Sequence, residues 1–309
     1  MRLVYTADLH GDIQSYRSLL DLAVTTGARA AIVGGDLLPH AIKLSSAIPV
    51  QRDFIETGLR PLLELFRARH PEISVYLLAG NDDWAAAISA LDGLEADGLA
   101  YPLHERVYRL NANASTQTMV VGDASSSPRI KPGGAVAHNL WLAGYACVPL
   151  TPFSIKDYER RDDGPLPPFS FGMAYASWSG EIKPIKAPAI DAQPSIAEGL
   201  AALAARSDPV RTIYVCHTPP ADTPLDQMPR EKHVGSRAVR AFVERYAPPL
   251  TLHGHIHEAP QMSGRYAAQI GATWCVNPGH DPRRFQAVAL DTDDLDGTIE
   301  HTVYGRPNA

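Results

Sequence analysis

Five short motifs along the chain combine aspartate, asparagine, histidine and glycine in a way that suits divalent metal ions. They read Asp8-Leu9-His10, Gly35-Asp36, Gly80-Asn81-Asp82-Asp83, Cys216-His217 and Gly254-His255-Ile256-His257. Two ions held close together need oxygen and nitrogen donors and a carboxylate able to bridge them. The set lacks cysteine ligands, which favours a catalytic pair with open positions over a structural zinc site. The candidate ligands are Asp8, His10, Asp36, Asn81, His217, His255 and His257.

Each of these residues also has an ordinary explanation when it is taken alone. A single histidine is usually solvated or part of the core, and an aspartate after a strand often caps a helix, as we expect for Asp12. The order and combination of all seven, rather than any one dipeptide, favour the metal interpretation.

Apolar runs precede the motifs, as is typical of strands that end at a binding site. In the first part of the chain, strands are predicted at residues 3–7, 30–33 and 73–78, with helices at 14–26 and 53–69. This alternation predicts an α/β fold with a mostly parallel sheet and ligands gathered at one edge. Further strands are predicted at 106–110, 118–121, 140–145, 211–215, 250–252, 266–270, 274–276, 286–290 and 298–304, and helices at 195–205 and 236–246.

A proline-rich stretch interrupts this pattern at about residues 149–194, which we interpret as an irregular excursion. Such a segment either has a functional role or is a mobile surface insertion without one. Because ligand motifs occur in both the first and the last hundred residues, we expect one domain over residues 1–309.

Composition narrows the function classes. A formal net charge of -6 and a pI near 6.0 argue against a broad basic face for nucleic acid, whereas a small phosphorylated substrate fits if metal ions supply positive charge. The three cysteines lie far apart, so no disulfide framework is expected. No apolar stretch reaches the length of a membrane span, and we expect a cytoplasmic location.

The ordered motifs, which span residues 8–257, resemble those of the calcineurin-like metallophosphoesterase family, and Asn277-Pro278-Gly279 is similar to a stretch in many bacterial members. The resemblance implies a four-layer sandwich of two mixed β-sheets flanked by helices. It also implies that Asp36 bridges two metal ions and that a hydroxide shared by them attacks phosphorus in a phosphate ester or phosphodiester. We expect Mn, and Fe, Zn, Ni or Co also suit these donors. The implied first-metal ligands are Asp8, His10 and His257, and the second-metal ligands are Asn81, His217 and His255.

One position departs from the family pattern. Most members have a substrate-facing histidine after the asparagine, where this chain has Asp82. As a catalytic residue, Asp82 either donates a proton to the leaving oxygen or belongs to a site suited to substrates that need little protonation. The second hypothesis is favoured because an ionised carboxylate repels a dianionic monoester.

Other side chains are candidates for binding a substrate phosphate: His40, Asp83, His280 and Arg283. Loop histidines and arginines are more often simply solvated. Two alternatives to a general phosphoesterase also stay open. One is a nuclease or cyclic-nucleotide phosphodiesterase, and the other is a catalytically weakened scaffold that acts as an interaction protein.

Overall fold

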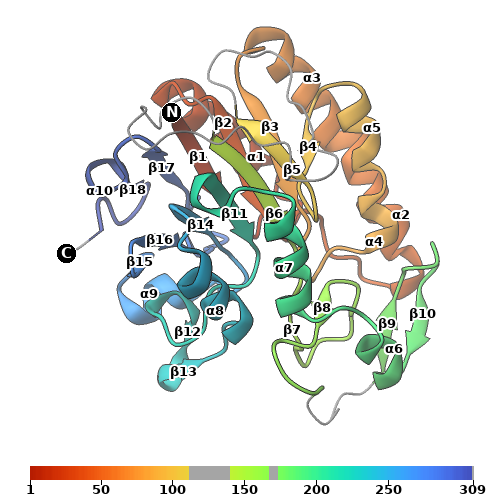
Figure 1. Ribbon diagram of the computed structural model, residues 1–309. Coiled ribbons are helices and arrows are strands. Elements are labelled where there is room, and N and C mark those ends of the chain that lie inside the picture. Colours follow the sequence, from red (N-terminus) through yellow and green to blue (C-terminus); the bar gives the residue numbers. More distant parts are fainter. Residues whose placement is uncertain (111–139, 167–172, 308–309) are drawn as a thin grey trace.

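The computed structural model describes residues 1–110, 140–166 and 173–307. Its first six-stranded sheet has the order β18-β17-β1-β2-β3-β4, in which β1 to β4 are parallel and β17 and β18 are antiparallel additions (Figure 1). The strand bounds are β1 Arg2–Thr6, β2 Ala30–Gly34, β3 Ser74–Leu78, β4 Tyr101–Pro102, β17 Val288–Asp291 and β18 Glu300–His301.

The second six-stranded sheet has the order β15-β16-β14-β11-β6-β5. Its four inner strands are parallel, and both edge strands are antiparallel. The strand bounds are β5 Val107–Leu110, β6 Leu140–Tyr145, β11 Thr212–Cys216, β14 Leu250–Leu252, β15 Ala267–Ile270 and β16 Thr273–Val276.

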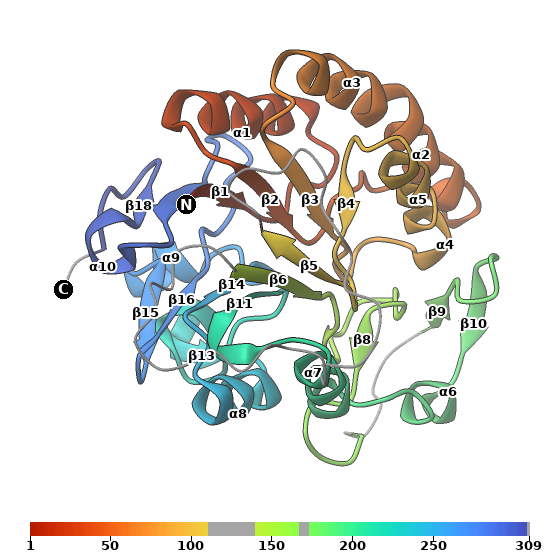
Figure 2. The ribbon, with the colours of Figure 1, turned by 45° about the horizontal axis from the view of Figure 1, so that its top comes forward.

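The two sheets pack face to face and helices cover their outer faces (Figure 2). In β1, Leu3 and Tyr5 pack into the core between the sheets, whereas Val4 packs into a second cluster with the helices. Strand side chains alternate between faces, so a continuous apolar strand fills both layers of packing. The four-layer α/β sandwich expected from the motifs is therefore confirmed. The helices are α1 Ile13–Thr26, α2 Ala47–Asp53, α3 Arg60–Arg69, α4 Ala85–Ile88, α5 Leu91–Ala96, α6 Ala187–Asp191, α7 Ile196–Ala205, α8 Arg237–Tyr246, α9 Ala259–Ser263 and α10 Leu295–Thr298.

Several element predictions need correction. The helix expected at 53–69 begins earlier, because α2, a π-helical segment Phe54–Leu59 and α3 follow one another without a break. The strand expected at 298–304 is reduced to β18, since α10 and a turn take up its two ends. The strand expected at 118–121 lies outside the described residues.

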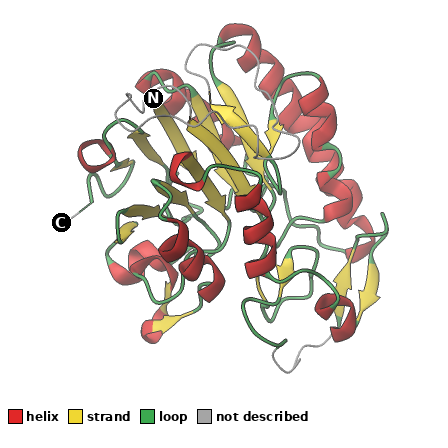
Figure 3. Cartoon of the chain, viewed as in Figure 1, coloured by secondary structure: helices red, strands yellow, loops and turns green. Residues whose placement is uncertain are grey.

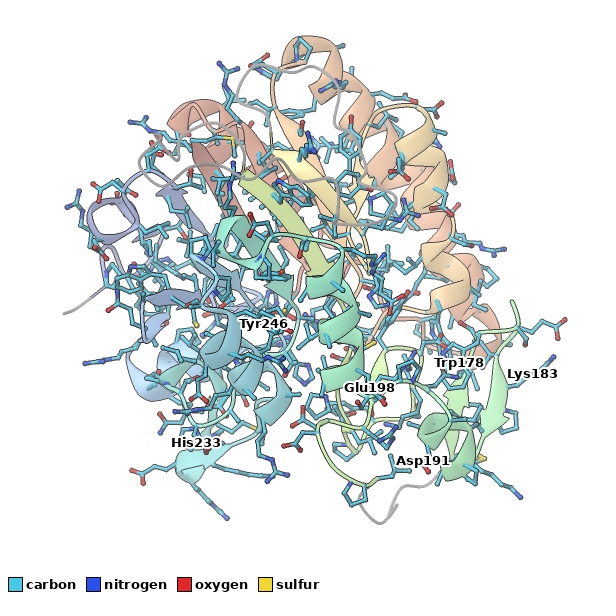
Figure 4. All side chains as sticks on the ribbon, in the orientation of Figure 1. Trp178, Lys183, Asp191, Glu198, His233 and Tyr246 are labelled. Atoms are coloured by element: carbon cyan, nitrogen blue, oxygen red, sulfur yellow. The ribbon has the colours of Figure 1, made fainter. Side chains whose placement is uncertain are left out.

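The excursion at 149–194 is more ordered than the prolines suggested. Its described part contains β8 Glu159–Arg160, which pairs with β7 Val148–Pro149, and the hairpin of β9 Ala174–Ala176 and β10 Lys183–Ile185, set apart from the two sheets in Figure 3. Figure 4 labels Trp178, Lys183 and Asp191 in this segment, which lies beside α7, the helix that contains Glu198. A third small pair, β12 Gln227–Met228 with β13 Lys232–His233, lies after β11.

Two carboxylates anchor the excursion. Asp157 is buried and accepts hydrogen bonds from the backbone N–H of Ala85, 2.9 Å away, and of Ser177, 2.7 Å away. Asp162 accepts from the N–H of Arg237 at the start of α8, at 2.7 Å. The bonds to Ala85 and Arg237 join the described part of the excursion to the rest of the chain.

The three cysteines are buried and unpaired, as expected. Among the described residues, no helix combines the length and the apolar character needed to cross a membrane. The single domain over residues 1–309 stays a prediction.

Candidate metal centre

The predicted ligands all follow the carboxyl ends of parallel strands. Asp8 and His10 follow β1, Asp36 follows β2 and Asn81 follows β3, and these strands are neighbours in the first sheet. In the second sheet, His217 directly follows β11, and Gly254 to His257 follow the neighbouring β14. Because the sheets are stacked, both sets of loops meet at one edge of the sandwich.

The donor atoms of these residues converge. The Nε2 atom of His217 lies 3.2 Å from Oδ1 of Asn81, 3.3 Å from Oδ2 of Asp36 and 3.9 Å from Oδ1 of Asp8. The Nε2 atom of His257 lies 3.3 Å from the same Asp8 oxygen. The candidate ligands thus form two subsets, one with Asn81 and His217 and the other with His257, and the carboxylates of Asp8 and Asp36 lie next to them.

The remaining ligands complete these subsets. Nε2 of His10 lies 3.4 Å from Nε2 of His257, and the His255 ring centroid lies 5.3 Å from that of His217. Asp36 has a carboxylate oxygen within 4.8 Å of the donor atoms of Asp8, His10 and His257, while it also contacts His217. This position next to both subsets suits the bridging role predicted for Asp36.

The donor set fits divalent ions. Ligand atoms about 2.1 Å from one ion and about 90–110° apart lie about 3.0–3.4 Å from each other, which is close to the spacings above. The Nε2 atoms of His10 and His257 face each other at 3.4 Å, so one cation can be bound by both. Mixed carboxylate, amide and imidazole donors suit first-row metals such as Mn, Fe, Co, Ni and Zn.

Hydrogen bonds behind the ligands fix their orientation. Nδ1 of His217 lies 2.9 Å from the carbonyl of Gly34, so this nitrogen carries the proton and Nε2 is left for an ion. The side-chain amide of Asn81 donates to Asp82 Oδ1 at 2.9 Å, which turns the amide oxygen toward His217. The N–H of His255 donates to both Asp8 oxygens, 3.1 Å away, and ties the two sheets together.

Burial and charge act against each other in the centre. Burial lowers the pKa of His10 to about 4 and that of His255 to about 3. Burial also acts on His217 and His257, but Asp36 beside the first and Asp8 beside the second raise both pKa values to about 9. The carboxylates therefore create a strongly negative potential, which favours bound cations.

The backbone of the centre is strained. Asp8, His10, Asp36 and His255 have φ angles of 61°, 45°, 49° and 65°, in the left-handed region that non-glycine residues rarely adopt. Each costs about 1–3 kcal/mol and persists only where surrounding contacts fix it. Strain concentrated on four predicted ligands marks this edge as the functional site.

Asp82 lies at the mouth of the centre. Its Oδ2 atom is 3.4 Å from Nε2 of His40 and 3.9 Å from Nδ1 of His10. The His40 ring stacks on His10 with centroids 5.1 Å apart, and it is more than half exposed. Burial, followed by the charge of Asp36, raises the pKa of Asp82 to about 7.

Asp83 has a different place from the one predicted. Its side chain is fully buried and accepts hydrogen bonds from the N–H groups of Leu37, Leu38 and Gly80 at 2.9–3.0 Å. The carboxylate therefore joins the loops after β2 and β3 and has no surface for a substrate. The prediction that Asp83 binds substrate is wrong.

His280 and Arg283 lie near His257. The His280 ring packs edge-on against His257 and His10, with centroids 5.2 and 5.7 Å apart. Arg283 is exposed and pairs with Asp281 at 3.1 Å. Both line a pocket that also contains His257.

Three further buried residues shape the centre without a recognisable sequence signal. Gln51 of α2 donates to the carbonyl of Asp82 at 3.1 Å and accepts from the N–H of Trp84 at 2.9 Å. His253 donates through Nδ1 to the carbonyl of Cys216 at the end of β11, 2.9 Å away. Asn277 donates to the carbonyls of Gly254 and Ile256, at 3.3 and 3.1 Å. Of these three residues, only Asn277 belongs to a motif described above, Asn277-Pro278-Gly279, and its role was not predicted.

Comparisons with known proteins give the family and the fold of the chain. The calcineurin-like phosphoesterase family model matches residues 1–259. The solved structure of TT1561 from Thermus thermophilus has 18% identity and a TM-score of 0.56, over 98% of each chain. A dimetal phosphatase from Danio rerio has 10% identity and a TM-score of 0.48, over 94% of this chain and 91% of that one. At 18% identity, the likeness to TT1561 shows the fold alone. No protein of curated function matches the chain significantly in sequence.

Proposed function

Since the chain belongs to the calcineurin-like phosphoesterase family and is a phosphoric ester hydrolase, we propose that it cleaves small phosphodiesters with two divalent ions, Mn first among them. Asp8, His10 and His257 would hold one ion. Asn81, His217 and His255 would hold the other, and Asp36 would bridge them. Such ions take up charge on phosphoryl oxygens and lower the pKa of water so that hydroxide is available near neutral pH.

One observation carries this proposal: donor atoms from loops far apart in sequence approach to 3.2–3.4 Å around two buried carboxylates. A scaffold that had lost catalysis would be expected to lose ligands. The chain keeps all seven, together with the hydrogen bonds that orient them, so the catalytic interpretation is favoured over the scaffold.

The preference for a diester follows from the mouth of the centre. Asp82 stands where most family members have a histidine, which can carry a positive charge. Its carboxylate lies near those of Asp8 and Asp36. A monoester brings two negative charges into this field, whereas a diester brings one. Bound cations would lower the pKa of Asp82, which keeps it ionised and repulsive. His40, 3.4 Å from Asp82, is placed to contact a substrate there.

The test begins with metal analysis of purified protein and turnover of bis-p-nitrophenyl phosphate and p-nitrophenyl phosphate in added Mn. We expect about two bound ions per chain, as a dinuclear centre requires, and a higher kcat/KM for the diester. A protein that binds no metal and hydrolyses neither compound would instead support the scaffold.

The role of Asp82 is tested separately with Asp82→His. Removal of the negative charge should raise monoester turnover relative to diester turnover by about tenfold, since one unfavourable charge contact near a site costs about 1–2 kcal/mol. Asp163→Asn, which removes an exposed charge from the excursion, serves as the control. An unchanged ratio in Asp82→His would remove Asp82 from the substrate contacts.

A nuclease is the less favoured alternative. An extended polyanion normally needs a basic track, and the chain carries a net charge of -6. A cyclic nucleotide is itself a phosphodiester, so it fits the proposed preference, and the comparison of diester with monoester turnover applies to it as well. The cytoplasmic location stays a prediction.

A further inference from the structure

A pocket of about 480 Å³ adjoins the metal centre at His257. The candidate ligand His257 lines it together with His280, Arg283, Arg284 and Tyr304. This volume is in the range of small-molecule sites. A substrate held at the metals through one phosphate can therefore extend into it.

A fixed turn places the two arginines on this pocket. The turn Asp281-Pro282-Arg283-Arg284 is closed by a hydrogen bond from the Arg284 N–H to the Asp281 carbonyl, 3.1 Å away. The Asp281 carboxylate also accepts from the N–H of Arg283 at 2.9 Å. Proline at the second position and this aspartate bond both favour the turn.

The loop before the turn is held equally well. The N–H of His280 donates to the His257 carbonyl at 3.1 Å, and His301 donates to the Pro278 carbonyl at 2.9 Å. The backbone at the two arginines thus keeps a set position relative to His257. An arginine on a fixed turn loses less conformational entropy when it binds an anion than one on a mobile loop.

Charge is distributed unevenly around the centre. Carboxylates surround the metal ligands and the mouth at Asp82, whereas the pocket has two arginines against the single acid Asp281. Arg283 is paired with that acid. Within the described residues, the Arg284 guanidinium has no hydrogen bond or ion pair, so one cation of the pocket is left for a ligand.

We propose that this pocket binds a second phosphate of the substrate, so that the enzyme acts on phosphodiesters that carry a further phosphate group. The inference rests on the proposed phosphodiesterase function and names its substrate class. Guanidinium groups bind phosphate through two parallel N–H···O bonds, and Arg284 is placed to do so while the diester lies at the metals.

The test compares two probes, thymidine 3′-(p-nitrophenyl phosphate) with and without a 5′-phosphate, on the Mn-loaded enzyme. We expect the phosphorylated probe to have the higher kcat/KM by about 10- to 100-fold, the range of a charge-assisted hydrogen-bond pair. Arg284→Ala should remove most of this ratio, and Arg284→Lys should keep part of it. Arg17→Ala, which removes an exposed arginine of α1 outside this pocket, should keep it all.

Two results would overturn the inference: equal rates for both probes with the wild type, or an unchanged ratio in Arg284→Ala and in the double variant with Arg283→Ala. If neither probe is hydrolysed, the phosphodiesterase proposal fails on its own. Calorimetry then still tests the pocket, because the wild type should bind thymidine 3′,5′-bisphosphate more tightly than thymidine 3′-phosphate, and Arg284→Ala should not.

Discussion

At the scale of single residues, glycine decides how closely the ligands approach. Gly35 has a φ of 123°, and a Cβ atom built on it would lie 2.0 Å from Nδ1 of His217. That nitrogen bonds the Gly34 carbonyl and fixes the ring. The glycine of the Gly-Asp motif is thus required by the histidine of another sheet, which no local pattern reveals.

We expect Gly35→Ala to weaken metal binding by about 10- to 100-fold, because the displaced His217 ring loses the partner that orients it. The loss should appear in metal titrations and in diester turnover. Gly180→Ala is the matched control, since Gly180 has a φ of 88° but no atom within 4 Å of its built Cβ. Both changes add backbone strain of about 1–3 kcal/mol, and only Gly35→Ala should change metal affinity. Equal affinities in the two variants would contradict the proposed contact.

The residue types predicted which side chains converge, but they predicted the neighbours of these side chains poorly. The seven candidate ligands could be grouped because their side chains are chemically distinctive and each follows a strand. Asp83 could not be separated from Asp82 in the same way, since two adjacent aspartates look alike until the fold shows which one meets the N–H groups of Leu37 and Leu38. Gln51 gave no signal, because a buried glutamine in a helix resembles a solvated one.

At the scale of elements, the loop after β14 depends on a neighbouring strand for its shape. Asn277 follows β16 and donates to the carbonyls of Leu225, Gly254 and Ile256, while its Oδ1 accepts from the N–H of Gly279. One buried side chain therefore ties the His255–His257 loop to Gly279, two residues before the turn that carries Arg283 and Arg284.

Asn277→Ala should lower metal affinity by about tenfold or more and destabilise the protein by about 1–3 kcal/mol, because buried carbonyls lose their donor. Ser195→Ala provides the comparison. It removes the N-cap of α7, at a cost of about 1 kcal/mol, far from the metal ligands. If Ser195→Ala lowered metal affinity as much as Asn277→Ala, general stability and not the loop would explain both effects.

Helices and strands whose apolar residues repeat at a clear spacing were predicted to within a few residues. The exceptions have physical causes. The run at 298–304 has strand-like composition, but Asp294 caps α10 through the N–H of Gly297 at 3.0 Å and leaves only two residues for β18. In the excursion, Lys156 and Glu159 form a buried ion pair three residues apart, in a segment where the prolines suggested no regular structure. The burial of such a pair depends on the packing of the whole fold and is not visible in residue types or spacing.

At the scale of the whole molecule, each sheet contributes ligands to both metal subsets. Asp8 from the first sheet meets His257 from the second, and Asn81 meets His217 across the same edge. The centre therefore needs both sheets packed together, which agrees with candidate ligand motifs placed at both ends of the sequence. Anything that loosens the packing between the sheets should also loosen the metal centre.

Buried neutral histidine makes the fold sensitive to acid. His301 of β18 is 2% exposed, donates from Nε2 to the Pro278 carbonyl and accepts at Nδ1 from the N–H groups of Val303 and Tyr304. Burial lowers the pKa of His301 to about 4, although the Pro278 bond opposes this shift and Arg284 adds to it. A proton on Nδ1 would replace an acceptor with a donor that faces two other donors.

The sign of the pH effect follows from this lowered pKa. Because the unfolded chain binds a proton near pH 6.5 and the folded chain only near pH 4, the stability due to neutral His301 is complete above about pH 6.5. It should fall by about 1.4 kcal/mol per pH unit as the pH drops through this window, to a total of about 3 kcal/mol. His301→Gln should be less stable than the wild type at pH 7, but its free energy of unfolding should fall less steeply between pH 6.5 and 4. The metal ligands titrate in both proteins, so their contribution cancels in the difference between the two denaturation series. Parallel curves for the two proteins would show that His301 takes up its proton as easily in the folded chain as in the unfolded one.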